Sequence, residues 1–260
     1  MYHSITTPLV SNNSKRLTGH SDFDECINGF NPGELILLTG KAGSLSFLLM
    51  NNLALKLAEE RDVLILEHES SEKWFRRRAL LYFDASGHDA FPINQFSLHY
   101  ETDVFFIEEI EKTIKRFTTK FENPIIFISP LQRLFLSKEL TLLSREEEIN
   151  KIIFNLKRIA VLYKVPIIIK SYIRSNNVNH GEPAWLDDIK EFDKALLAID
   201  KKIFTHWPGY FVKGSSKSFK TGNELMHVSI ACGARNNNGF FKLEFDYHKH
   251  KIFFEDSIQI

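Results

Sequence analysis

The loop after the first strongly apolar run of the chain carries residue types that bind phosphate. A phosphate-binding loop needs glycines, whose backbone N–H groups converge on the oxygens, then a lysine for the β- and γ-phosphates and a hydroxyl for magnesium. The loop follows the apolar run 34–39, and its glycines fall where such a loop begins. The candidates for a degenerate nucleotide-binding loop are Gly40, Lys41, Gly43, Ser44 and Ser46. The alternative is a plain turn that leads the strand into its helix.

The end of this loop departs from the phosphate-binding pattern. Where Gly-Lys-Ser/Thr is needed, the sequence has Leu45, Ser46 and Phe47. A leucine lacks the backbone freedom of glycine, and a phenylalanine cannot bind a metal ion. We therefore expect this loop to bind a triphosphate much more weakly than an intact phosphate-binding loop does.

Strands and helices alternate along the chain and predict an α/β protein. Apolar runs between turn residues indicate buried strands, and apolar residues at helical spacing indicate the helices. Ser144, followed three residues later by Glu147, is a capping box at the start of the clearest helix. The expected strands are 34–39, 63–66, 124–128, 165–169 and 195–199, and the expected helices are 47–60, 71–83, 103–120 and 144–164. Such alternation implies a mostly parallel sheet with right-handed crossovers.

The C-terminal part changes character and predicts antiparallel strands. Segments 227–232, 240–247 and 251–256 are joined by tight turns. We expect residues 1–16 to be an irregular arm and residues 17–260 to form one domain. Ligands of open α/β sheets bind beyond the carboxyl ends of the strands, so the chemistry should lie there.

Composition and charge exclude several classes of protein. The chain has 33 basic and 33 acidic residues, so total charge does not drive binding to nucleic acid. No apolar run is long enough to cross a membrane, and the N-terminus has no signal-peptide pattern. The two cysteines, Cys26 and Cys232, lie far apart and favour a reducing, cytoplasmic location. The ten histidines show no metal spacing, so no metal site is expected.

Two segments near the N-terminus carry a family resemblance. Residues 17–24 are similar to a "TG…LD" opening, and residues 28–35 look like a "G-x-x-x-G-E/D-L" lead into the first strand. On these motifs and their order, the chain resembles the RecA-like P-loop ATPases. Among them it is most similar to the C-terminal domain of DnaB-type replicative helicases and to the related KaiC/RadA branch. The resemblance implies a three-layer RecA-like fold and extends to the C-terminus.

The resemblance also implies roles for single residues, and most of the active ones are replaced. Ser46 stands at the Walker A lysine, Phe47 at the magnesium-binding hydroxyl and Ser129 at the Walker B aspartate. Glu69 matches the glutamate that polarises the attacking water, and Gln132 is kept. Since phosphoryl transfer depends on positioning and charge stabilisation, these losses predict a domain without helicase-like ATP hydrolysis.

Arginines and lysines further along the chain have two interpretations. The resemblance gives Arg235 the role of reaching the γ-phosphate of a neighbouring subunit, whereas the turn chemistry of 236–239 favours a solvated hairpin residue. The family holds single strands through loops after its third and fourth strands, which brings in Lys170 and Arg174. A separate basic run with interleaved aromatic residues consists of Lys213, Lys217 and Lys220. Lysines can contact the phosphate backbone of a single strand while aromatic rings stack on its bases. The alternative is a lysine-rich loop that is only solvated.

The sequence thus predicts a degenerate DnaB/RecA-like domain that is not an ATPase. It would bind single-stranded DNA or protein in replication, recombination or repair, as a homo-oligomer or in a mixed ring with an active RecA-like homologue. No cofactor and no membrane are expected. The first alternative is an active ATP-dependent helicase, with ATP and magnesium, rebuilt around Lys41, Ser44 and Glu69. The second alternative is a protein-interaction scaffold with neither nucleotide nor DNA.

Overall fold

The computed structural model describes residues 18, 21–41, 45–84, 97–137, 143–173, 193–206, 224–232, 238–246 and 251–253. The helices are α1 (Ser21–Ile27), α2 (Ser46–Leu57), α3 (Glu72–Asp84), α4 (Ile107–Lys120) and α5 (Arg145–Tyr163), with short 3-10 helices η1 (Leu131–Arg133) and η3 (Asp193–Ala198). The strands are β1 (Leu35–Gly40), β2 (Asp62–Glu67), β3 (Leu98–Glu101), β4 (Pro124–Ser129), β5 (Ile167–Tyr172), β6 (Lys201–His206), β7 (Glu224–Cys232), β8 (Asn238–Asp246) and β9 (Lys251–Phe253).

The described strands form one sheet in the order β3-β2-β4-β5-β1-β6-β7-β8-β9. The six strands from β3 to β6 run parallel, and β6, β7, β8 and β9 pair antiparallel in succession. Because β1 lies between β5 and β6, it occupies the middle of the sheet, and later strands are added on both sides of it. The predicted α/β class with a mostly parallel sheet is confirmed.

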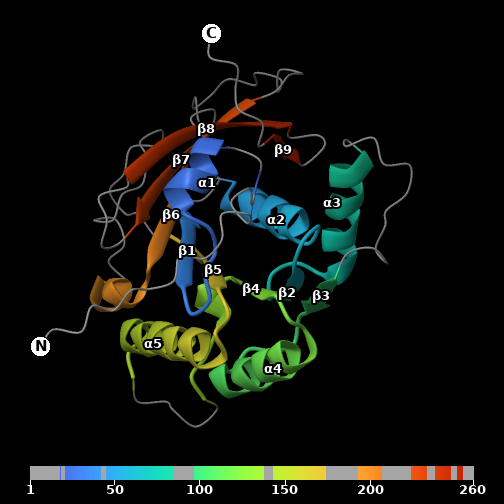
Figure 1. Ribbon diagram of the computed structural model, residues 1–260. Coiled ribbons are helices and arrows are strands. Elements are labelled where there is room, and N and C mark those ends of the chain that lie inside the picture. The colour runs from blue at the N-terminus through green and yellow to red at the C-terminus, as the bar shows by residue number, and fades with distance from the viewer. Residues whose placement is uncertain are drawn as a thin grey trace, which may run out of the picture.

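Helices cover both faces of the parallel part of the sheet (Figure 1). Helices α1, α2 and α3 lie on one face, and α4 and α5 lie on the other, so the molecule has three layers. The strands supply both cores by alternation: Ile36 and Leu38 of β1 pack with the first group of helices, and Leu35 and Leu37 pack with the second. Burial on both faces is why these strands appear in the sequence as nearly continuous apolar runs.

The C-terminal strands curl over the α1 and α2 side of the molecule (Figure 1). Leu243 and Ile252 join the core formed by these helices. The backbone N–H of Ile252 donates to Oδ1 of the buried Asn52 in α2, at 2.8 Å. The antiparallel extension is therefore packed against the same core as the first helices.

Most expected elements are present, and the differences have physical causes. The capping box of α5 is confirmed, since Ser144 Oγ accepts from the Glu147 N–H while the Glu147 carboxylate accepts from the Ser144 N–H. The strand expected at 195–199 is wrong. This segment is η3, where the Ala195 N–H donates to Asn150 Oδ1 of α5, and the strand is the lysine-led β6 that follows. Helix α1 and strand β3 were not predicted.

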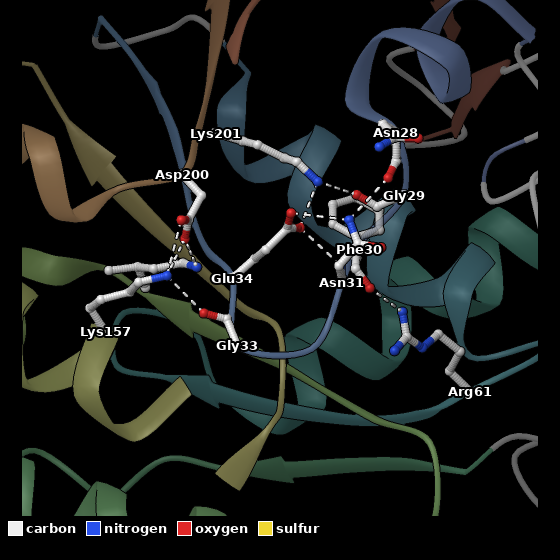
Figure 2. A network of polar contacts seen from close by, with 11 residues as sticks. Asn28, Gly29, Phe30, Asn31, Gly33, Glu34, Arg61, Lys157, Asp200 and Lys201 are labelled. Atoms are coloured by element: carbon white, nitrogen blue, oxygen red, sulfur yellow. Dashed lines mark hydrogen bonds and ion pairs between the residues drawn. The ribbon is translucent and has the colours of Figure 1, made fainter. Parts of the chain in front are cut away.

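Two lysines close the amino end of the sheet. Lys201 Nζ lies 2.5 Å from Glu34 Oε2 and donates to the Gly29 carbonyl at 2.6 Å. Lys157 Nζ contacts Asp200 Oδ2 at 2.7 Å and the Gly33 carbonyl at 2.8 Å. Figure 2 shows both ammonium groups pointing into this cluster of carboxylates and carbonyls, which ties the entry of β1 to α5 and β6.

Arg61 extends the same network at its far side, where its guanidinium donates to the Phe30 carbonyl at 3.2 Å (Figure 2). Burial lowers the pKa of this guanidinium. The amino end therefore fixes the turn before β1 through side chains that bind backbone carbonyls.

Candidate functional site

The strand order brings the predicted site residues to one edge of the sheet. The carboxyl ends of β2, β4, β5 and β1 lie side by side, with Glu67 paired in register to Ser129 and Gly40 to Tyr172. Glu69 follows β2, Gln132 lies in η1 after β4, and Lys170 lies within β5. This is the edge at which open α/β sheets bind their ligands.

The connection from β1 into α2 keeps an unusual backbone conformation at Leu45. This residue has φ 60° and ψ 22°, which is the left-handed region, and stands immediately before the first residue of α2. Leu45 therefore takes a conformation that glycine adopts without strain, although leucine lacks the backbone freedom of glycine. The Leu45 side chain is buried in the α1–α2–α3 core, and this burial offsets a strain of about 1–2 kcal/mol.

A buried lysine occupies the centre of the candidate site. The Lys170 side chain is 3% exposed, and its ammonium donates to the Tyr172 hydroxyl at 2.6 Å. The same ammonium lies 3.5 Å from Ser129 Oγ and 3.6 Å from Glu69 Oε2. The Tyr172 hydroxyl in turn donates to the Glu69 carboxylate. Lys170 thus lies close to both Ser129 at the end of β4 and Glu69 after β2.

Burial perturbs the charged groups around this lysine. It lowers the pKa of Lys170, while the nearby carboxylates of Glu69 and Glu67 partly restore it. Burial also raises the pKa of Glu67, against the opposing effects of the Glu69 N–H, the Lys170 charge and a hydrogen bond from Ser129. Since Glu67 accepts from the N–H groups of His68 and Glu69, it shapes the turn that carries Glu69.

Gln132 has a bridging role between two strand ends. Its Nε2 donates to Ser171 Oγ at 2.8 Å and to the Tyr172 carbonyl at 3.1 Å, and its Oε1 accepts from the Tyr172 N–H at 3.3 Å. Thr39 Oγ1 also donates to the Ser171 carbonyl. These contacts fasten the ends of β1, β4 and β5 to one another.

The described residues do not fit a magnesium–triphosphate group. Phe47 offers no oxygen ligand, and its ring lies 5.3 Å from the guanidinium of Arg78. Ser129 is fully buried beside the Lys170 ammonium, which would repel a divalent cation at that position. Within the described ranges, no group of three or more His, Cys, Asp or Glu residues could hold a metal ion.

The other predicted site residues divide into three groups. Gly40, Lys41 and Ser46 flank the β1–α2 connection, with Ser46 buried in the first turn of α2. Lys170 is not a surface lysine, so its expected contact with a nucleic acid does not fit its burial. The remaining candidates lie outside the described residues: Gly43, Ser44, Arg174, Lys213, Lys217, Lys220 and Arg235.

Sequence reasoning missed Glu67 and Tyr172 as members of the site. One signal was available: β5 reads IIIKSY, so a lysine interrupts a run that must be buried on both faces. A buried ammonium needs partners, which must come from neighbouring strand ends. The identity of those partners depends on strand order, which the sequence does not reveal directly.

The comparisons with known proteins are structural, because no family model and no curated protein matches the chain in sequence. A solved structure of a DnaB-like replicative helicase, described with its interactions with primase, is 17% identical to this chain with a TM-score of 0.75. That likeness covers 90% of this chain and 60% of the helicase chain, so this chain spans less than two thirds of its length. The ATPase domain of G40P is also 17% identical, with a TM-score of 0.77, covering 94% of this chain and 93% of that domain.

These likenesses show a RecA-like fold of the kind found in DnaB-like helicase ATPase domains. They concern backbone geometry and carry no assignment of activity at this level of identity. No helix among the described residues is both long and apolar enough to span a membrane.

Proposed function

We propose that this chain is a RecA-fold domain that does not hydrolyse ATP and that acts as a binding module for single-stranded nucleic acid or for protein in DNA replication, recombination or repair. The single observation that carries the proposal is the position of Lys170. Its ammonium contacts Tyr172 and lies close to Ser129 and Glu69, where magnesium and the attacking water would otherwise be organised. Glu69 is accordingly a vestigial catalytic residue.

The magnitude of the losses supports an inactive site. Ser46, Phe47 and Ser129 replace three groups that stabilise charge during phosphoryl transfer. Each group of this kind is worth about 3 kcal/mol of barrier. Glu69 alone does not compensate, because an attacking water has no positioned phosphate to reach.

The test is calorimetric titration of the whole chain with magnesium-ATP, repeated without magnesium, together with a phosphate-release assay. We expect no binding at millimolar nucleotide and no release above background, with or without single-stranded DNA. The positive control restores the missing groups in one variant, Leu45→Gly, Ser46→Lys, Phe47→Thr and Ser129→Asp, with Lys170→Ser to remove the competing cation.

Micromolar, magnesium-dependent binding by the unaltered chain would overturn the proposal in favour of an active ATPase. In that case hydrolysis should disappear in Glu69→Gln and in Lys170→Ala. Assembly into a ring, alone or with an active RecA-like homologue, is part of the proposal, because the solved neighbour is described as a replicative helicase with primase. Sedimentation with and without such a homologue measures it.

A further inference from the structure

The outer face of α3 combines exposed aromatic, basic and apolar side chains. Helix α3 buries Phe75, Ala79, Tyr82 and Phe83 against the core. The opposite face presents Lys73, Trp74, Arg77 and Leu80, spaced along successive turns of the helix. Trp74 is 55% exposed and Leu80 48% exposed, so large apolar surfaces remain in water here. We call these four residues the α3 surface.

The tryptophan of the α3 surface is held by a cation. The guanidinium carbon of Arg77 lies 5.5 Å from the centre of the Trp74 ring. Arg76 is neutralised by Glu72, whose carboxylate accepts from its Nε at 2.8 Å. Within the described part of the chain, Lys73 and Arg77 take part in no ion pair, so two positive charges flank a presented indole.

The place of α3 in the fold connects this face to the candidate site. Four residues separate the end of β2 from the start of the helix, and this turn carries Glu69. Arg78, on the inner side of α3, donates to Ser70 Oγ of that turn at 3.4 Å and lies over the Phe47 ring. Figure 1 shows α3 at the side of the molecule, between β3 and β9, and Lys251 Nζ of β9 lies 5.6 Å from the centre of the Tyr82 ring of α3.

From these observations we infer that the α3 surface binds single-stranded nucleic acid, with a base stacked on Trp74 and adjacent phosphates on Lys73 and Arg77. The inference rests on the proposed binding-module function and assigns it a surface. Stacking on an aromatic ring and cationic contacts to the backbone are the two components of sequence-tolerant single-strand binding. An acidic peptide would use the two cations and leave the indole unused, whereas a base and its phosphate use both.

The test measures binding of a fluorescein-labelled dT20 to the whole chain by fluorescence anisotropy at several salt concentrations. Trp74→Ala should weaken binding about tenfold or more, the usual consequence of losing one stacked base. The double variant Lys73→Glu, Arg77→Glu should lower the steepness of the log–log salt dependence by about 1.4, which is two phosphate contacts on a single strand.

Matched variants on other helices control for exposure and for net charge. Phe154→Ala removes an aromatic on α5 that is 51% exposed, close to the exposure of Trp74. Lys112→Glu with Lys115→Glu reverses two exposed charges on α4, as the double variant does on α3. Both controls should bind dT20 like the unaltered chain, and thermal melting checks that every variant is folded.

Three results would overturn the inference. If the chain binds dT20 and the α3 variants bind equally well, this surface is wrong although the binding-module function stands. If the control variants lose as much affinity as the α3 variants, the contact is non-specific attraction. If the chain binds acidic vesicles or an acidic peptide through Trp74 and does not bind dT20, the partner class is wrong. Magnesium-ATP titration is independent of all three.

Discussion

The two ends of the parallel sheet each bury a lysine but surround it differently. At the amino end, Lys201 meets a carboxylate at 2.5 Å and a carbonyl at 2.6 Å. At the carboxyl end, the nearest partner of Lys170 is a phenol at 2.6 Å, and its carboxylate partner Glu69 lies at 3.6 Å. The first arrangement is a closed ion pair that fixes the entry of β1. The second is a cation shared among the Tyr172 hydroxyl, the Ser129 hydroxyl and the Glu69 carboxylate.

Left-handed backbone conformations occur at both ends of the sheet. The turn before β1 uses Gly33 for its left-handed conformation, with φ 82°, and glycine takes this conformation without strain. The connection after β1 uses Leu45, with φ 60°. At the amino end Asn28 (φ 49°) and Lys164 (φ 51°) are also left-handed, so the two ends differ in the partners of their lysines and not in backbone strain.

The sharpest test of this contrast removes one lysine at a time. Lys201→Met should lower the free energy of unfolding by about 3–5 kcal/mol, because Glu34 is left partly buried without its cation. Lys170→Met should change it by only about 1 kcal/mol, since Glu67 can take up a proton in response. Urea unfolding measures both.

The control is Lys56→Met, which breaks an exposed pair with Glu59 and should lose less than about 1 kcal/mol. Equal losses of unfolding free energy in Lys201→Met and Lys170→Met would show that the two buried lysines contribute alike to stability, which would contradict the contrast between the two ends of the sheet.

A second experiment measures the strain at Leu45. Leu45→Ala should lower stability by about 2–5 kcal/mol through lost burial. Leu45→Gly makes a similar cavity but relaxes the backbone, so it should be about 1 kcal/mol more stable than the alanine variant. Thermal and urea unfolding of the pair give this difference. An alanine variant more stable than the glycine variant would show that the left-handed conformation is not retained in solution.

The smallest expected effect concerns pH. Burial raises the pKa of Glu67 in the folded chain, so this group favours folding below its unfolded pKa. That contribution is lost as the pH rises through the folded pKa. Glu67→Gln does not titrate, so its stability relative to the unaltered chain should rise with pH across that window, by about 1.4 kcal/mol for each pKa unit. A pH-independent difference would contradict a perturbed Glu67.

Much of the fold could be predicted from the sequence, because strands buried on both faces and a capped helix have strong local signals. The α5 capping box and the runs that form β1 and β4 are of this kind. The strand β6 was missed because it begins with two lysines, Lys201 and Lys202, which are buried here. Lys201 is paired with Gly29 and Glu34, which are distant in sequence, whereas Lys202 donates to the Ile199 carbonyl three residues before it. The α3 surface was not predicted, since the packing of the helix against the core sets which of its side chains are exposed.

The position of the candidate site on the sheet could be predicted from the sequence, but the set of side chains that meet there could not. The loop after β1 was located from its glycines and their place after an apolar run, whereas Ser46 and Ser129 were singled out only through the family resemblance. The cluster around Lys170 depends on β5 lying beside both β1 and β4, a relation between segments far apart in the chain. Tertiary pairing of this kind has no local signature.

The central position of β1 has a consequence for synthesis on the ribosome. This strand is the first of the sheet to be translated, yet both of its neighbours come late: Thr39 bonds to the carbonyl of a residue 132 positions further on. A nascent chain therefore carries a strand that is fully buried in the folded protein, with two unpaired edges, until β5 and β6 have emerged. Such a segment is a binding site for chaperones and a starting point for aggregation, so slow translation between β1 and β5 should harm the yield of this protein more than slow translation after β6.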